Sequence, residues 1–188
     1  PDLPGLDAFQ GRVFHSSRWD HRCHLRGQRV AVIGTGASAI QFIPEIAPQV
    51  ATLNVYQRTP PWILPKLDLP MPSVVRDLLR LPGAKALLRG LLYGGFESFG
   101  IGFRHPRVLR QLEYLARAHL RVTVRDPQLR ARLTPDYTLG CKRILLSNNY
   151  YPALTRANED VLATGVVAIE GNTVVGAEGS RREADVII

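Results

Sequence analysis

The segment RVAVIGTGASAIQ, residues 29–41, combines a glycine-rich turn with the flanking elements that phosphate binding requires. Gly34, Gly36 and Ala39 have the spacing G-x-G-x-x-G/A, directly after a short apolar run and at the start of a helix-like stretch. The first glycine permits the tight turn, the second lets backbone N–H groups approach a pyrophosphate, and the small third residue lets the helix pack against the strand. The helix N-terminus adds partial positive charge. The pattern predicts a dinucleotide site with contacts from Gly34, Thr35, Gly36, Ala37, Ser38, Ala39 and Gln41.

The end of the next apolar run indicates which dinucleotide is preferred. An NAD-binding unit usually carries Asp or Glu there for the ribose hydroxyls, whereas the run at 52–58, TLNVYQR, leads into Arg58 and Thr59. Because arginine can donate a charge-assisted pair of hydrogen bonds to a 2′-phosphate, these residues favour NADP(H) over NAD(H). The alternative interpretation of Arg58 is a surface arginine on a loop.

The elements around these motifs predict an α/β fold. The runs 29–34 and 52–58, with a helix-like segment between them, form a strand–helix–strand unit of a Rossmann-like NADP-binding domain. Pro44 lies inside the helix-like segment and is expected to bend or interrupt it, at a cost of about 3 kcal/mol. Short β-branched runs between 161 and 188 predict a small β-meander, antiparallel, with the last residues forming a strand that enters the core.

A connector and a helical insertion are predicted between these parts. The segment 59–72 is so rich in proline that no regular structure is expected there. Helical patterns then begin at Ser73 and, most clearly, at Pro106, a residue suited to the first position of a helix. The segment 133–154 is turn-rich.

The net charge of +8 comes from this insertion. Residues 70–133 hold twelve Lys or Arg against four Asp or Glu, and the rest of the chain holds twelve of each. Such a segment could contact nucleic acid, an anionic membrane surface or an acidic partner. Its arginines recur beside leucines at helical spacing, which favours a solvated helical face, so no nucleic-acid partner is predicted.

Composition limits the remaining classes. With 45% apolar residues, the 188-residue chain can form a substantial core. Cys23 and Cys141 are too few for a disulfide framework and suggest no metal site, so a reducing, cytoplasmic location is expected. The most apolar stretch, 86–103, is interrupted by Arg89, Glu97 and several glycines, so no membrane span is predicted.

Four ordered motifs resemble those of one enzyme family. Phe9, Gly11, His15 and Trp19 have the form FxGxxxHxxxW, and Asp20 follows. GTGASA, QRTPPW and GCKRILLSNNYYPAL come after it in order. Together they resemble Baeyer–Villiger monooxygenases, the NADPH- and FAD-dependent enzymes of the class B flavoprotein group, and the resemblance spans essentially the whole chain.

The resemblance implies a domain organisation. The chain would be an NADP-binding domain fragment of a two-lobed enzyme, with the FAD-binding segments outside it, and it would not turn over substrate alone. The expected parts are an interdomain linker with the fingerprint (1–28), the first part of the NADP-binding domain (29–69), the basic helical insert (70–133), and the second part with the β-meander leading back to the FAD domain (134–188).

The resemblance also implies an activity and roles for residues. In this family NADPH reduces FAD, and one oxygen atom of O2 is inserted into a ketone to give an ester or lactone. Lys142 would join Arg58 and Thr59 around the 2′-phosphate, and Arg143 would be the catalytic arginine that stabilises the anionic oxygenated flavin. His15 in the linker would position rather than transfer protons. Tyr150 and Tyr151 are expected to be packing residues.

Other functions remain possible at this stage. A flavin monooxygenase that oxidises nitrogen or sulfur shares the cofactors, although its fingerprint usually closes with Tyr or Phe, so Trp19 followed by Asp20 favours the Baeyer–Villiger type. A non-catalytic NADP-binding module could use the basic insert to dock a partner. A small complete NADP dehydrogenase is disfavoured, because no catalytic Ser, Tyr and Lys set is recognisable. The substrate and the oligomeric state are not predicted.

Overall fold

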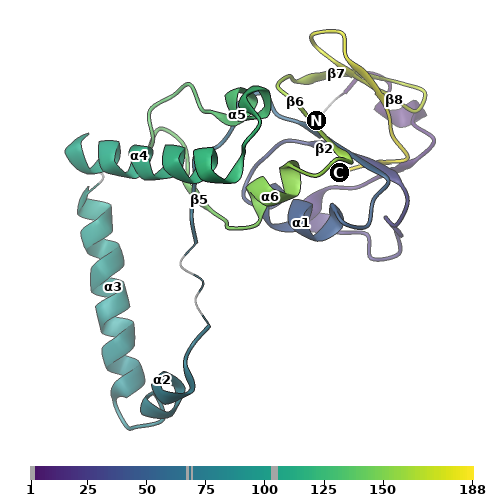
Figure 1. Ribbon diagram of the computed structural model, residues 1–188. Coiled ribbons are helices and arrows are strands. Elements are labelled where there is room, and N and C mark those ends of the chain that lie inside the picture. Colours follow the sequence, from purple (N-terminus) through teal and green to yellow (C-terminus); the bar gives the residue numbers. More distant parts are fainter. Residues whose placement is uncertain (1–2, 67, 69, 103–105) are drawn as a thin grey trace.

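Five parallel strands form the central sheet in the computed structural model, which describes residues 3–66, 68, 70–102 and 106–188 (Figure 1). In spatial order they are β1 (Arg12–Val13), β10 (Val186–Ile187), β2 (Arg29–Ile33), β3 (Thr52–Tyr56) and β6 (Glu159–Leu162). All neighbouring strands pair in parallel. The predicted α/β class is confirmed, and so are the strand–helix–strand unit and the final strand that enters the core.

Both faces of this sheet are covered, which explains why its strands are apolar without strict alternation. Val30 and Val32 pack toward α1 (Ala39–Ile46) and α6 (Tyr150–Leu154), where Tyr150 and Tyr151 are buried as predicted. Ala31 packs on the opposite face against a second sheet. That sheet is the predicted antiparallel meander, with strands β7 (Val166–Glu170), β8 (Thr173–Gly176) and β9 (Arg181–Glu183).

Helix α1 tolerates the proline within it. It continues past Pro44 to Ile46, and the next residue, Ala47, donates its N–H to the carbonyl of Ile43 at 2.9 Å. Pro44 lies in the second turn, so only the carbonyl of Ile40 loses its helical donor. Three buried isoleucines hold the helix on the sheet, and the proline does not interrupt it.

One sequence prediction is wrong in the connector at 59–72. Residues Ile63–Leu64 form a short strand, β4, which pairs in parallel with β5 (Leu145–Leu146). The Leu145 N–H donates to the Trp62 carbonyl at 3.0 Å, and the Ser147 N–H donates to the Leu64 carbonyl at 3.1 Å. The prolines at 60, 61 and 65 flank the two paired residues, so the ladder loses no donor to them.

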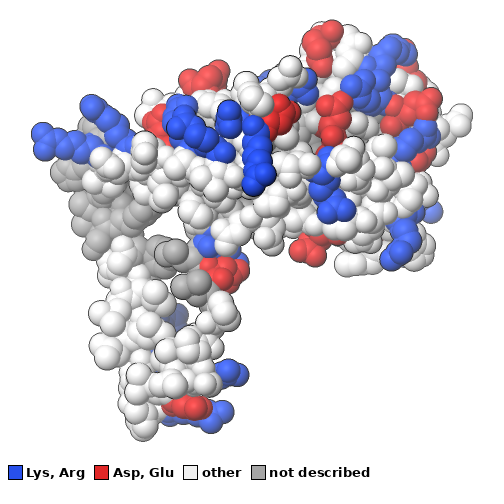
Figure 2. All heavy atoms as spheres, viewed as in Figure 1, with Lys and Arg blue, Asp and Glu red and all other residues white. Residues whose placement is uncertain are grey.

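The insertion is helical, and the predicted starts at Ser73 and Pro106 are confirmed. Its helices are α2 (Ser73–Leu78), α3 (Ala84–Gly102), α4 (Pro106–Thr123) and α5 (Pro127–Leu133). Figure 1 shows α2 and α3 extending away from the sheets, while α4 lies over β4. Ala116 and Leu120 are buried on the side of α4 that faces the protein, whereas arginine side chains gather on its exposed surface (Figure 2). This matches the predicted solvated basic face.

The remaining elements are short, and none of the described helices could cross a membrane. Two 3-10 helices, η1 (Leu6–Ala8) and η2 (Ser16–Arg18), lie in the first segment on either side of β1. Among the described residues, no helix has both the length and the apolar character that a bilayer span needs.

The β4–β5 pair is reinforced by one side chain, which provides a test of its contribution to the fold. The Oδ1 of Asn148 accepts from the Lys66 N–H at 2.8 Å, and its Nδ2 donates to the Lys66 carbonyl at 2.8 Å. Replacing Asn148 with Ala removes both hydrogen bonds, and we expect the free energy of unfolding, measured with denaturant, to fall by about 1–2 kcal/mol. Asn149→Ala is the control, because the Asn149 side chain makes no hydrogen bond to the described residues. Equal stability of the two variants would contradict this role.

Candidate nucleotide-binding site

The glycine turn lies where β2 ends and leads into α1. Gly34 has φ of +106°, in the left-handed region that favours glycine. A Cβ at Gly36 would meet no heavy atom within 4 Å, so the backbone there faces open space that a phosphate could enter. The Gly34 N–H donates to the Tyr56 carbonyl at 2.9 Å, which ties the turn to the end of β3.

Three segments far apart in the sequence meet at this edge of the sheet. Because β2 and β3 are parallel, their carboxyl ends lie together, and the β4–β5 pair adds the residues just before β5. A cleft of about 540 Å³ results. Of the predicted site residues it is lined by Gly34, Thr35, Gly36, Ala37, Arg58, Thr59, Lys142 and Arg143.

The other predicted contacts lie beside this cleft or outside it. Ser38 and Ala39 line an adjoining cleft of about 280 Å³ together with His15, and this second space shares Gly34 and Gly36 with the first. Gln41 is on the exposed side of α1 and lines neither cleft. The structure therefore brings together all predicted nucleotide contacts except Gln41.

The charge in the 540 Å³ cleft is entirely positive. Arg58, Lys142 and Arg143 are exposed, and none has an ion-pair partner in the described part of the chain. No Asp or Glu lines the cleft. Unpaired guanidinium and ammonium groups beside open backbone N–H groups form a site suited to a ligand with several phosphates.

The sequence analysis did not assign four of the lining residues to the site, and two of these, Gln57 and Tyr137, are polar. The Tyr137 ring lies 4.7 Å from the Lys142 ammonium, and its carbonyl accepts from the Trp62 Nε1 at 2.8 Å. Gln57 is 1% exposed and precedes Arg58 at the end of β3. The sequence offered one indication for Gln57, because it is a polar residue that directly follows an apolar strand. For Tyr137 there was none, since its contact with Lys142 depends on the fold.

The fingerprint residues support the chain next to the turn. Phe9 is buried against the second sheet, and a Cβ at Gly11 would collide with the Asp185 carbonyl oxygen. The Trp19 ring packs 5.2 Å from that of Phe14 and 5.3 Å from that of Phe42 on α1. These contacts fasten the first segment to the nucleotide-binding unit.

His15 acts as a cap in this segment. Its Nδ1 accepts the Ser17 N–H at 3.1 Å at the start of η2. The Ser17 Oγ lies 2.7 Å from the same nitrogen. Both contacts hold the ring at the margin of the smaller cleft.

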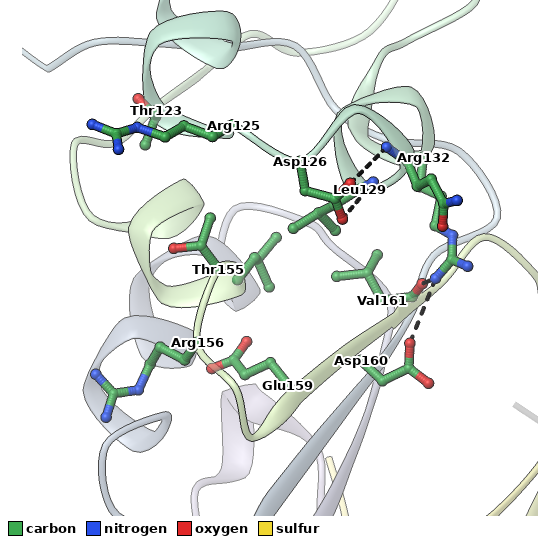
Figure 3. Close-up of a pocket in the computed structure, with 12 residues that line it drawn as sticks. Thr123, Arg125, Asp126, Leu129, Arg132, Thr155, Arg156, Glu159, Asp160 and Val161 are labelled. Carbon is green, nitrogen blue, oxygen red and sulfur yellow. Dashed lines mark hydrogen bonds and ion pairs between the residues drawn. The ribbon is translucent and has the colours of Figure 1, made fainter.

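A further cleft, of about 550 Å³, lies at the opposite edge of the sheet, where β6 begins (Figure 3). It mixes charges of both signs: Arg132 pairs with Asp160 at 3.5 Å, and Asp126 caps α5 through the N–H groups at 128 and 129. Figure 3 shows the Glu159 carboxyl group pointing toward the segment that carries Arg156. Burial raises the pKa of Glu159 to about 8. Among the described residues, this cleft has no glycine turn, and it is lined by three acidic residues, Asp126, Glu159 and Asp160, so it is a poorer match to a nucleotide with several phosphates than the 540 Å³ cleft.

The chain is similar to known flavin-binding and Baeyer–Villiger monooxygenases. The FMO-like family, described as flavin-binding monooxygenase-like, matches residues 1–75. A Baeyer–Villiger monooxygenase of Streptomyces coelicolor is 52% identical over 190 residues, covering 100% of this chain and 37% of the relative. One of Pseudomonas aeruginosa is 53% identical over 190 residues, covering 100% and 36%. The chain thus spans little more than a third of the length of these relatives.

Solved structures share the fold over the whole chain. A steroid monooxygenase bound to NADP has a TM-score of 0.82 at 27% identity, covering 100% of this chain and 43% of that one. A cyclohexanone monooxygenase with a TM-score of 0.81 is 24% identical, covering 100% and 44%, and shows the fold alone. The predicted resemblance is confirmed, and it extends from one end of the chain to the other.

Arg58 provides a direct test of the nucleotide preference. We expect Arg58→Ala to raise the dissociation constant of NADP⁺ by about 10- to 100-fold, because a charge-assisted pair to the 2′-phosphate is lost. NAD⁺ lacks that phosphate, so its affinity should stay within about twofold. Titration calorimetry measures both. Arg156→Ala, in the cleft at the start of β6, is the control, and an unchanged preference for NADP⁺ in Arg58→Ala would reject the assignment.

The buried Glu159 predicts how stability depends on pH. Its folded pKa of about 8 exceeds its ordinary value of 4.5, so the folded state retains a proton that the unfolded state loses. The contribution of the Glu159 carboxyl group to the free energy of unfolding is therefore fully present below about pH 4.5 and is lost as pH rises toward 8. We expect Glu159→Gln to match the parent at pH 4.5 and to exceed it by roughly 1–2 kcal/mol at pH 8.5, allowing for solvent screening.

Thermal unfolding across this pH range checks the prediction. Glu45→Gln is the control, because Glu45 is exposed on α1 and its removal should leave the pH profile unchanged. A Glu159→Gln variant that follows the parent at every pH would show that the carboxyl group is not protonated in the folded protein.

Proposed function

We infer that the chain is the NADP(H)-binding segment of a Baeyer–Villiger monooxygenase, an NADPH- and FAD-dependent enzyme that inserts one oxygen atom of O2 into a ketone to give an ester or lactone. The observation that carries this inference is the 540 Å³ cleft, where the glycine turn, Arg58 and the Lys142–Arg143 pair converge. The whole chain also aligns with relatives that are more than half identical over 190 residues. The activity of the whole protein is part of the proposal.

NADP(H) fits the residues that line the cleft. The open backbone at Gly36 suits the pyrophosphate, and the unpaired cations Arg58 and Lys142, with the Thr59 hydroxyl, suit the 2′-phosphate. The Lys142 ammonium already lies over the Tyr137 ring, so less side-chain freedom is lost when it meets a phosphate. When bound, NADPH would supply a hydride and FAD would supply the oxygen-activating chemistry.

Arg143 is the residue of this chain that would act on the reacting groups. A guanidinium stays protonated at any catalytic pH, and Arg143 has no carboxylate partner among the described residues that would neutralise it. Arg143 follows Lys142 in the chain, but our assignment does not use Arg143 to bind the 2′-phosphate. Its charge can therefore stabilise developing negative charge and polarise the substrate carbonyl.

The first segment would link this domain to the FAD-binding part. We propose that 1–28 forms the interdomain linker, 29–69 and 134–188 form the NADP-binding domain, and 70–133 forms the basic helical insert. The capping contacts of His15 and the packing of Trp19 on Phe42 support a linker that moves with the nucleotide-binding unit. Free Cys23 and Cys141 support a cytoplasmic location.

Product analysis tests the proposed reaction. The intact protein with FAD, NADPH and O2 should convert members of a panel of cyclic and linear ketones to lactones and esters, with NADPH consumption matching product. Formation only of N-oxides or S-oxides from amines or sulfides would instead identify a nitrogen- or sulfur-oxidising flavin monooxygenase. NADP⁺ binding without any flavin-dependent oxidation would indicate a non-catalytic module.

Arg143→Ala separates catalysis from nucleotide binding. We expect ester formation to fall by about 100-fold or more, because one electrostatic contact to the developing charge is lost. The dissociation constant of NADP⁺ should change less than about threefold, since the assigned phosphate contacts remain. Arg130→Ala, in α5 away from the cleft, is the control. Unchanged ester formation in Arg143→Ala would show that this arginine does not take part in the reaction.

A further inference from the structure

Gln57 lies where the glycine turn and the end of β3 are joined. Its N–H donates to the Leu162 carbonyl at 2.9 Å, and the carbonyl of the preceding Tyr56 accepts the Gly34 N–H at 2.9 Å. Gln57 lines the 540 Å³ cleft beside Arg58, although its side chain is only 1% exposed. Gln57 is thus a buried polar residue of the cleft, next in the chain to Arg58 and to the residue that binds the glycine turn.

The amide of Gln57 has a fixed orientation. Its Nε2 donates to the Arg132 carbonyl in α5 at 2.9 Å. Because a carbonyl can only accept, the nitrogen must face α5. The Oε1 is shielded from water and has no hydrogen-bond donor among the described residues. A buried acceptor without a donor is costly. A ligand in the cleft that donates a hydrogen bond to this oxygen would remove that cost.

The position of Gln57 in the fold indicates which ligand group would donate this hydrogen bond. In dinucleotide-binding units, a carboxylate at the end of this strand accepts hydrogen bonds from the adenosine ribose. A carboxylate beside Arg58 would repel a 2′-phosphate, whereas a carboxamide is neutral and still accepts. With the 2′-oxygen phosphorylated, the 3′-hydroxyl is the donor left on that ribose.

We propose that Gln57 accepts a hydrogen bond at Oε1 from the 3′-hydroxyl of the adenosine ribose of NADP(H), and that its neutral amide, where a carboxylate would repel the 2′-phosphate, favours NADP(H) over NAD(H). The proposal rests on the proposed function, because it requires NADP(H) in this cleft. This hydrogen bond to the ribose would add to the charge contacts that Arg58 and Lys142 make with the phosphate. The proposal also explains why an amide, rather than a carboxylate, follows β3.

A thermodynamic cycle tests the contact: the ligand hydroxyl and the protein amide are removed separately and then together. The probes are 2′,5′-ADP and its 3′-deoxy analogue, titrated by calorimetry into the intact protein and into Gln57→Met, which has a similar volume and no amide. We expect loss of the 3′-hydroxyl to weaken binding about tenfold in the parent and less than twofold in Gln57→Met. Gln49→Met is the control, because Gln49 makes the same kind of amide-to-carbonyl bond, to Glu45 at 2.9 Å, at an exposed position just after the end of α1.

Gln57→Glu tests specificity separately. Its carboxylate should weaken NADP⁺ binding by roughly tenfold or more while leaving NAD⁺ binding equal or tighter. Equal weakening of both nucleotides would overturn the specificity role. Melting temperatures measured without ligand identify any variant that fails to fold.

The parent protein alone decides the contact if the variants do not fold. Equal affinity of the parent for 2′,5′-ADP and the 3′-deoxy analogue would overturn the proposal while leaving NADP binding intact. Failure of the parent to bind 2′,5′-ADP or NADP⁺ at all would instead overturn the proposed function, and the Gln57 contact with it.

Discussion

The nucleotide cleft depends on the short parallel pair between β4 and β5. Two residues of each strand pair across a sequence separation of about eighty residues, through the backbone bonds at Trp62, Leu64, Leu145 and Ser147. This pair brings the Lys142–Arg143 turn next to Arg58, although the whole helical insertion lies between them in the chain. Without it, the cleft would have a glycine turn and a single cation.

Several weak contacts reinforce this pair and explain why it persists. Trp62 is buried beside β4, its Nε1 binds the Tyr137 carbonyl, and the Arg117 guanidinium of α4 lies 5.0 Å from its ring. The Tyr137 ring in turn lies against Lys142. The insertion is therefore structurally part of the nucleotide site, because α4 supports the segment that places the lysine.

The local parts of this arrangement could be predicted from the sequence, and the long-range parts could not. The glycine turn and the strands around it follow from spacing and apolar runs within about thirty residues, which local propensity specifies well. The β4–β5 pair was missed because the prolines near Ile63 argue against a strand unless the partner strand is known. Lys142 and Arg143 were found only through the family resemblance, since by themselves they resemble any basic turn.

Gln57 and Tyr137 show a second limit. Each is a common residue in an unremarkable local pattern, and its role depends on atoms contributed by α5 and by the turn before β5. The need of the Gln57 oxygen for a donor exists only after folding has buried it, so no sequence pattern could report it. The same holds for the raised pKa of Glu159, which arises from burial at the opposite edge of the sheet.

A crystal structure of the intact protein with NADP⁺ would test the central claim most directly. The account predicts the pyrophosphate at the turn around Gly36 and the 2′-phosphate within hydrogen-bonding distance of Arg58, Thr59 and Lys142 at the same time. A 2′-phosphate that contacts only one of the two segments, Arg58–Thr59 or Lys142, or a nucleotide bound in the cleft at the start of β6, would contradict it.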